Sequence, residues 1–226
     1  YRAKLLTVLR HHLTAAKHTI EQDFLATHDG AVYVGQHARC IDALLRLLRD
    51  EACKIIPQSD EIAVIAVGGY GRGEMAPFSD IDVMFLMPAK TSKKHEAAIE
   101  FMLYLLWDLG LKIGHSTRSI TEAINAGRDD QTVMTSFLEM RLVCGDAALW
   151  TKLSDALRLE IAKNKPLVFV EEKLAERDLR HKRFGDTRYV VEPNVKDGKG
   201  GLRDLHSLLW IATYAYLADS TMYVLE

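Results

Sequence analysis

Gly68-Gly-Tyr-Gly-Arg-Gly-Glu-Met-Ala-Pro-Phe-Ser-Asp-Ile-Asp82 is the stretch of sequence that decides the fold of this chain. Its glycine-rich first half predicts a turn or loop. Residues 61–67 before it and residues 81–87 at its end are short, almost wholly apolar and rich in β-branched side chains. That profile is typical of strands buried on both faces. We therefore predict two buried strands joined by a glycine-rich loop.

Asp80 and Asp82 carry the chemistry of this stretch. Their spacing at the start of the second strand places both carboxylates on one face. Carboxylates on an apolar strand are unfavourable unless a charge compensates them, and an oxygen-coordinated Mg²⁺ or Mn²⁺ ion does so. The glycine turn would bring backbone N–H groups to the phosphates that share such a cation, and Ser79 and Arg72 add a hydroxyl and a positive charge. The pattern predicts a metal-dependent nucleotidyl-transfer site, and the alternative is two solvated aspartates after an ordinary turn.

Two other phosphate-binding loops are excluded by spacing. Gly68 and Gly73 have the separation found in a Walker A loop, but Glu74 and Met75 follow where that loop needs Lys and then Ser or Thr. The dinucleotide-binding fingerprint also fails, because Glu74 stands where its third glycine belongs. Neither cofactor class is supported.

The rest of the chain predicts helices around a small mixed sheet, an α/β (α+β) fold. Helical spacing of apolar residues covers residues 4–25, 34–56 and 91–109, and a third strand is expected at 111–118. Everything after about residue 120 is predicted to be helical, in segments 120–127, 130–143, 146–163, 166–184 and 202–218. The expected division is 1–57 for N-terminal helices, 58–145 for a catalytic core and 146–226 for a helical domain that contributes to the nucleotide site.

Composition is that of an average soluble globular protein. The 226 residues are 48% hydrophobic and 27% charged, which excludes disordered, collagen-like and low-complexity classes. A formal net charge of −2 gives no argument for nucleic acid or a membrane as partner. Cys40, Cys53 and Cys144 form no C-x-x-C pair, so we expect reduced thiols and a cytoplasmic location.

A basic stretch precedes the last predicted helix. From Arg177 to Arg203 there are eight Lys or Arg residues against four Asp or Glu. Gly200 and Gly201 directly precede the helix, whose first N–H groups are suited to anions, and Lys196 and Arg203 lie nearby. The stretch predicts a wall facing a triphosphate. The alternative is a structured turn whose bases pair with Glu192 and Asp204.

Three segments together resemble the bacterial PII uridylyltransferases, a family within the nucleotidyltransferase superfamily. They are the Gly68–Asp82 stretch, then Gly114-His-Ser-Thr-Arg118, then Glu192-Pro-Asn-Val-Lys-Asp-Gly-Lys-Gly-Gly-Leu-Arg-Asp-Leu-His206. The three occur in the family's order, which makes the resemblance specific. The glycine loop and the two aspartates alone would indicate only the superfamily.

The resemblance implies transfer of UMP from UTP to a tyrosine of the nitrogen-signalling protein PII, with release of pyrophosphate. Full-length members of that family also carry an HD domain that removes UMP and two ACT domains that sense glutamine. Neither is visible in these residues, so we expect a portion of a longer enzyme, with glutamine sensing confined to the full-length protein. His28-Asp29 stands alone and is interpreted as a helix end.

The expected site follows from the pattern and the resemblance together. Asp80 and Asp82 are expected to bind the metal and, with His115, to act in catalysis. Residues expected to bind the nucleotide are Gly68, Gly69, Tyr70, Arg72, Gly73, Ser79, Arg118, Lys196, Gly200, Gly201 and Arg203. The superfamily commonly has a third carboxylate on a following strand, which residues 111–118 lack. Either Asp108, Asp130 or Glu139 fills that role, or the family works with two carboxylates and His115.

Two other functions remain open on the sequence. One keeps the fold and changes the transfer, for example adenylyl transfer to a protein or to an aminoglycoside-like small molecule. The other is a non-catalytic nucleotide-sensing module that uses the same pocket. The two aspartates argue against a sensor, because a sensor need not keep two charged metal ligands.

Overall fold

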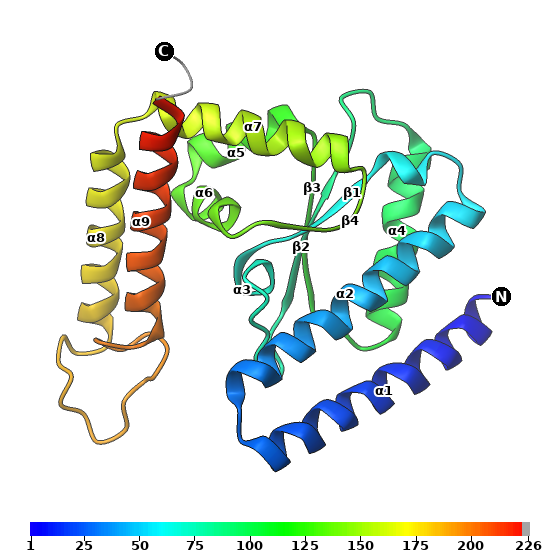
Figure 1. The fold of residues 1–226 in the computed structure, drawn as a ribbon, viewed down its shortest axis with the longest axis horizontal. Helices are drawn as coiled ribbons and strands as arrows, with labels where there is room; N and C mark the ends of the chain where they lie inside the picture. The colour runs from blue at the N-terminus through cyan, green and yellow to red at the C-terminus, as the bar shows by residue number, and fades with distance from the viewer. Residues whose placement is uncertain (223–226) are drawn as a thin grey trace. The chain divides into compact units, whose positions relative to one another are not determined.

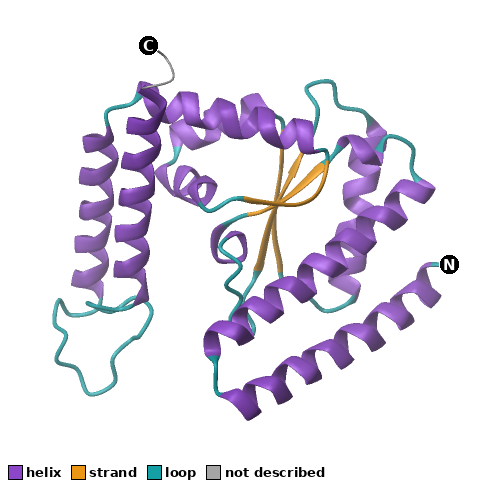
Figure 2. Ribbon diagram, in the orientation of Figure 1, coloured by secondary structure: helices purple, strands orange, loops and turns teal. Residues whose placement is uncertain are grey.

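A computed structural model describes residues 1–222 (Figure 1). The predicted class is confirmed: helices frame a small mixed sheet (Figure 2). Along the chain the elements are α1 (Arg2–Thr27), α2 (Gly30–Ile55), the 3₁₀ turn η1 (Ser59–Glu61), β1 (Ala63–Ala66), α3 (Gly68–Gly71), β2 (Ile81–Leu86), α4 (Lys93–Asp108), β3 (Ile113–Arg118), α5 (Ile120–Asp129), α6 (Gln131–Leu138), β4 (Arg141–Gly145), α7 (Ala147–Lys163), α8 (Pro166–Arg183) and α9 (Leu202–Met222).

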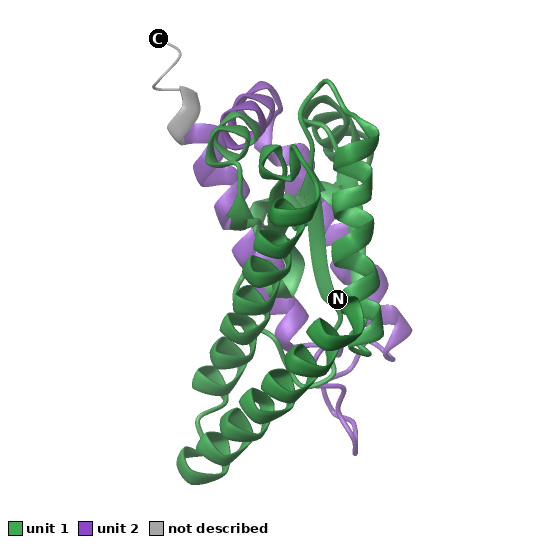
Figure 3. Ribbon diagram, turned by 90° about the vertical axis from the view of Figure 1, so that its right-hand side faces the viewer, with its two compact units in different colours: residues 1–153 green, residues 154–226 purple. Residues whose placement is uncertain are grey.

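The chain packs as two compact units (Figure 3). Unit 1 is Tyr1–Leu153 and unit 2 is Ser154–Glu226, so the division falls inside α7. The predicted boundary at residue 145 lies just before this point. The finer division into N-terminal helices, catalytic core and helical domain stays a prediction.

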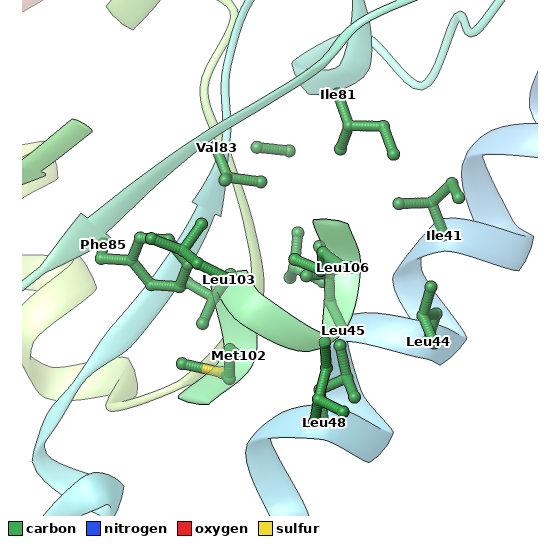
Figure 4. Packing of buried hydrophobic residues seen from close by; sticks show 14 of the residues in the cluster. Ile41, Leu44, Leu45, Leu48, Ile81, Val83, Phe85, Met102, Leu103 and Leu106 are labelled. Carbon is green, nitrogen blue, oxygen red and sulfur yellow. The ribbon is translucent and has the colours of Figure 1, made fainter. Parts of the chain in front are cut away.

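The sheet of unit 1 has the strand order β3-β2-β1-β4. Strand β1 pairs antiparallel with β2 and with β4, whereas β2 and β3 run parallel. One face of the sheet packs on α2 and α4, and the buried side chains there include Ile81, Val83 and Phe85 of β2 (Figure 4). Alternation along a strand then assigns Asp82 to the other face.

Strand β4 is a correction to the sequence-based prediction. Residues 130–143 were expected to form a single helix, but α6 ends at Leu138 and a strand begins at Arg141. The strand hydrogen-bonds along the free edge of β1, with Arg141 opposite Ala66. Pairing with a distant strand therefore overrides the local helical spacing.

His28 and Asp29 form the turn between α1 and α2. His28 ends α1 in the left-handed conformation (φ 56°), and its N–H donates to the carbonyl oxygen of Phe24 at 2.7 Å. The Asp29 carboxylate accepts from the N–H of Val32 at 3.0 Å and caps α2. The interpretation of this dipeptide as a helix end is confirmed.

Cys40, Cys53 and Cys144 are all free thiols. Within the described part of the chain, none of the helices combines the length and apolar character that crossing a membrane requires.

Candidate active site

Asp82 is a half-buried carboxylate near the start of β2, and Asp80 directly precedes the strand. Burial raises the pKa of Asp82, and the negative charge of Asp80 raises it further. In the described part of the chain, neither carboxylate has a hydrogen-bond or ion-pair partner. The negative charge of the pair is therefore not compensated by any side chain of residues 1–222 through a hydrogen bond or an ion pair.

Two glycines flank the Asp82 carboxylate. A β-carbon added at Gly114 would lie 2.3 Å from Oδ1 of Asp82, and one added at Gly68 would lie 3.6 Å from Oδ2. Gly114 is opposite Asp82 in the β2–β3 pairing, and Gly68 has a positive φ of 59°. Position 114 therefore admits no side chain while the carboxylate keeps this place, and the glycine turn begins beside it.

The glycine turn forms the single helical turn α3 instead of an irregular loop. Its first residues are Gly68 and Gly69, and the first N–H groups of a helical turn have no acceptor within it. The N–H of Val67 donates to the carbonyl oxygen of Asp82 at 3.1 Å. Turn and carboxylates are thus neighbours, as the sequence predicted, and Gly73 closes the turn with a φ of 75°.

Tyr70 is buried beneath the glycine turn. Its side chain is only 2% exposed, and its hydroxyl donates to Oδ1 of Asp42 at 2.7 Å. Arg141 also donates to Asp42, and it donates to the carbonyl oxygens of Tyr70 and Gly71, each at 3.3 Å. Burial, then the hydrogen bond to Asp42, raise the pKa of Tyr70. Tyr70 therefore anchors the turn, and its role toward a nucleotide stays a prediction.

Arg72 is held on the other side of the turn. Its guanidinium forms an ion pair with Glu139 and a second one with Glu74 at 2.9 Å. A β-carbon at Gly71 would lie 2.1 Å from the carbonyl oxygen of Glu139, so turn and α6–β4 connection are in direct contact. Arg72 is thus used to hold the turn in this structure, instead of being free to contact phosphate.

His115 is not brought together with the aspartates. It pairs with Val83 across the sheet, which places it on the face opposite Asp82. There its ring contacts Trp107 of α4 edge-to-face, with ring centroids 5.9 Å apart. His115 has no place in the site as the structure forms it.

Ser79 and Arg118 form no hydrogen bond with the carboxylates in the described part of the chain. Ser79 lines a mainly apolar cavity of about 720 Å³ together with residues of α1 and α2, and neither aspartate borders that cavity. Arg118 shares the face of Asp82, but it pairs with Leu86, four residues along the strand and roughly 13 Å away.

The candidates for a third carboxylate are used elsewhere. Asp108 pairs with Arg2 of α1 at 2.5 Å, the carboxylate of Asp130 caps α6, and Glu139 pairs with Arg72. Among the described residues, no group of three His, Cys, Asp or Glu side chains is placed to hold a metal ion. The site as formed offers two carboxylates.

The predicted phosphate-binding residues of the basic stretch lie in unit 2. The Gly200 N–H donates to Asp204 at 2.7 Å, and Gly201 closes a turn in which its N–H donates to the Gly198 carbonyl oxygen at 2.9 Å. Arg203 stacks over Trp210, with 5.6 Å from Cζ to the ring centroid, and Lys196 is exposed. Their roles toward a nucleotide stay predictions.

Asp42 and Arg141 are the functional residues that the sequence analysis missed. Asp42 carries a recognisable signal, because it interrupts the apolar face of α2 between Ala38 and Leu45 and is only 6% exposed. An acidic residue at such a position needs a buried partner. Arg141 carries no comparable signal, since it was assigned to a helix.

Comparison with known proteins matches both units. The nucleotidyltransferase domain family model matches residues 45–142, and the GlnD PII-uridylyltransferase family model matches residues 168–225. Bifunctional uridylyltransferase/uridylyl-removing enzymes are similar to this chain: that of Rhodospirillum rubrum is 48% identical over 95% of the chain, and that of Rhodopseudomonas palustris is 45% identical over 96%. The enzyme of Ruegeria pomeroyi is 55% identical over 73% of the chain.

The alignments cover 24% of the length of the Rhodospirillum and Rhodopseudomonas enzymes. The chain thus spans about a quarter of the curated relatives it matches. It belongs, as a segment of that extent, to the family of bifunctional uridylyltransferase/uridylyl-removing enzymes and contains a nucleotidyltransferase domain.

Proposed function

We propose that this chain transfers UMP from UTP to a tyrosine hydroxyl of the PII signalling protein and releases pyrophosphate. The names of its relatives support this donor and this acceptor. The observation that carries the proposal is the Asp80–Asp82 pair, whose negative charge has no partner among the described residues. Gly68, which begins the α3 turn, lies beside the half-buried carboxylate of Asp82. Acidic ligands and backbone donors are the two requirements for holding a metal-bound triphosphate.

Asp80 and Asp82 fit a divalent cation, Mg²⁺ or Mn²⁺. Both offer hard oxygen ligands, and burial together with the charge of Asp80 raises the pKa of Asp82, so a bound cation would favour its charged form. When bound, the cation would neutralise charge on the phosphates and favour in-line displacement at the α-phosphorus. The two carboxylates leave the remaining coordination positions to phosphate oxygens and water, as is usual for Mg²⁺.

The residues around the aspartates orient the nucleotide. Gly68 lies beside the Asp82 carboxylate and begins the turn with Gly69, and the N–H groups of both glycines would bind phosphate oxygens. The Asp42–Tyr70–Arg141 network on one side and the Arg72–Glu139 ion pair on the other hold the turn in place. Catalysis would then consist mainly of positioning and electrostatic stabilisation.

The bond changes are those of a substitution at phosphorus. The tyrosine oxygen forms a bond to the α-phosphorus, the bond from that phosphorus to the α,β-bridging oxygen breaks, and pyrophosphate leaves with the bond electrons. The hydroxyl proton passes to water. A tyrosine hydroxyl has an unperturbed pKa of about 10, so its deprotonation must accompany the attack.

The experiment that tests the proposal compares donors and acceptors. The protein is incubated with Mg²⁺, PII and either α-labelled UTP or α-labelled ATP, and label in PII is counted. We expect incorporation from UTP, none when the acceptor tyrosine of PII is replaced by phenylalanine, and little from ATP. Preferential transfer from ATP would replace the proposal with adenylyl transfer. Tight binding of metal and UTP without pyrophosphate release in the presence of PII would replace it with nucleotide sensing.

A further inference from the structure

Unit 2 contains a polar cavity of about 660 Å³ where the C-terminal end of α8 meets the N-terminal end of α9. It is lined by four basic side chains, Arg177, Lys182, Arg188 and Lys199, together with His181 and three aspartates. Of the residues expected to bind phosphate in this region, only Gly200 lines it. All four of these bases lie within the basic stretch from Arg177 to Arg203 that the sequence predicts as a phosphate-facing wall.

The three aspartates of the cavity are already neutralised by neighbours. Asp204 accepts hydrogen bonds from Nε2 of His181 at 2.9 Å and from the Gly200 N–H at 2.7 Å, and it forms an ion pair with Arg180. Asp186 pairs with Lys199 at 2.9 Å, and Asp178 pairs with Arg177 at 2.8 Å. Their charges are thus taken up by other groups of the cavity wall.

Two cations of the wall make no direct contact with its aspartates, although the charge of Lys182 contributes, after Lys199 and His181, to lowering the pKa of Asp186. Lys182 and Arg188 have no hydrogen-bond or ion-pair partner among the side chains that the structure describes. Both are exposed and line the cavity. A cavity of this size, with its acidic groups paired and two of its bases unpaired, is complementary to an anion with several charges.

Asp204 gives this wall its shape. The carboxylate joins the α8 residues Arg180 and His181 to the turn that begins α9, where Gly200 has a positive φ of 83°. Burial alone would raise the pKa of Asp204, but the hydrogen bonds from Gly200, His181 and Arg180 outweigh burial and lower it. Asp204 is ionised at neutral pH and is a positioning residue for the cavity.

We infer that this cavity binds a polyphosphate, either the phosphate chain of a nucleoside triphosphate or pyrophosphate, through Lys182 and Arg188 and without a divalent metal. A polyphosphate carries several charges within a few ångströms, and both Lys and Arg are suited to binding it. That the anion is a polyphosphate instead of an acidic peptide rests on the proposed function, which uses a triphosphate and releases pyrophosphate.

The test measures pyrophosphate binding by titration calorimetry in EDTA, where the Asp80–Asp82 pair has no metal. The unsubstituted protein is expected to bind pyrophosphate saturably and more weakly as NaCl is raised. Lys182→Ala with Arg188→Ala should weaken binding by at least about tenfold. The matched control, Lys165→Ala with Arg158→Ala, removes two exposed bases of unit 2 that do not line the cavity, and should bind within about twofold of the unsubstituted protein.

The outcomes separate this inference from the proposed function. Asp80→Asn with Asp82→Asn should leave binding in EDTA unchanged even where it abolishes UMP transfer. UTP and pyrophosphate are then compared for binding to the cavity in EDTA. Tighter binding of UTP assigns the cavity to the nucleotide, whereas tighter binding of pyrophosphate assigns it to the leaving group. The inference would be overturned if pyrophosphate did not bind in EDTA, or if the control variant lost as much affinity for pyrophosphate as the Lys182/Arg188 variant. Tighter binding of a polyglutamate peptide than of pyrophosphate would also overturn it.

Discussion

Arg141 and Asp42 form a two-point ion pair, with Nη1 2.7 Å from Oδ2 and Nη2 3.0 Å from Oδ1. The pair joins β4 to α2. Because Tyr70 of the glycine turn also donates to Asp42, the turn is attached to both elements. The geometry of the candidate site therefore depends on residues that contact neither metal nor nucleotide.

Removal of Asp42 is expected to destabilise the protein strongly. Asp42→Ala leaves a half-buried guanidinium and a buried hydroxyl without their partner, so the free energy of unfolding in urea should fall by roughly 3 kcal/mol. Tyr70→Phe removes one buried hydrogen bond and should cost about 1 kcal/mol. Asp60→Ala, at an exposed aspartate, is the control. Equal stability of the Asp42 variant and this control would contradict the role of the network.

A side chain at position 114 is expected to displace the Asp82 carboxylate. Gly114→Ala places a β-carbon 2.3 Å from Oδ1, so the carboxylate must move by about 1 Å or more. A shift of that size can lower activity on the order of a hundredfold, which the rate of UMP transfer would measure. Gly30→Ala is the matched control, because a β-carbon at Gly30 meets nothing within 4 Å. Full activity of Gly114→Ala would show that the carboxylate position does not matter.

The raised pKa of Asp82 predicts the sign of its effect on stability. Because the folded-state pKa lies above the unfolded one, ionisation of Asp82 destabilises the metal-free protein as the pH rises through the folded pKa. In EDTA at pH 7, Asp82→Asn should therefore raise the melting temperature or leave it unchanged. Any gain in melting temperature from this substitution should vanish below pH 3.9 or so, which is about the pKa of an aspartate in the unfolded chain. Added Mg²⁺ should stabilise the unsubstituted protein alone, and a lower melting temperature for Asp82→Asn in EDTA would refute this account.

His115 is expected to be dispensable for the chemical step. Since it packs against Trp107 on the opposite face of the sheet, His115→Ala should keep kcat for UMP transfer within about threefold. A fall in kcat as large as that of the Asp80 and Asp82 variants would show that His115 takes part in catalysis.

The parts of the fold that were predicted correctly are those set by local sequence. The almost wholly apolar composition of residues 61–67 and 81–87 predicts the buried strands that they contain, and the side of Asp80 and Asp82 follows from strand alternation. The cap at His28-Asp29 is equally local. These features depend on residues within a few positions of one another.

What the sequence did not predict depends on pairing between distant segments. Strand β4 forms only because β1 offers an edge, and the face of His115 depends on the register that sets Gly114 opposite Asp82. The partners of Tyr70 and Arg72 are 28 and 67 residues away, so the pattern around the turn could not reveal that both side chains were already engaged. Pairing of Asp204 with a base of the basic stretch, by contrast, was one of the two alternatives that the sequence left open, and Arg180 is the base that pairs with it.

The central claim is that Asp80 and Asp82 hold the metal for nucleotidyl transfer, and the rate of UMP incorporation into PII tests it most directly. Asp80→Asn with Asp82→Asn is compared with Asp60→Asn plus Asp155→Asn, which makes the same change at two exposed aspartates without partners among the described residues. We predict a loss of at least about a hundredfold for the first pair and a rate within twofold of the unsubstituted protein for the second. Near-normal transfer by the Asp80/Asp82 variant, in a protein that remains folded, would contradict the account.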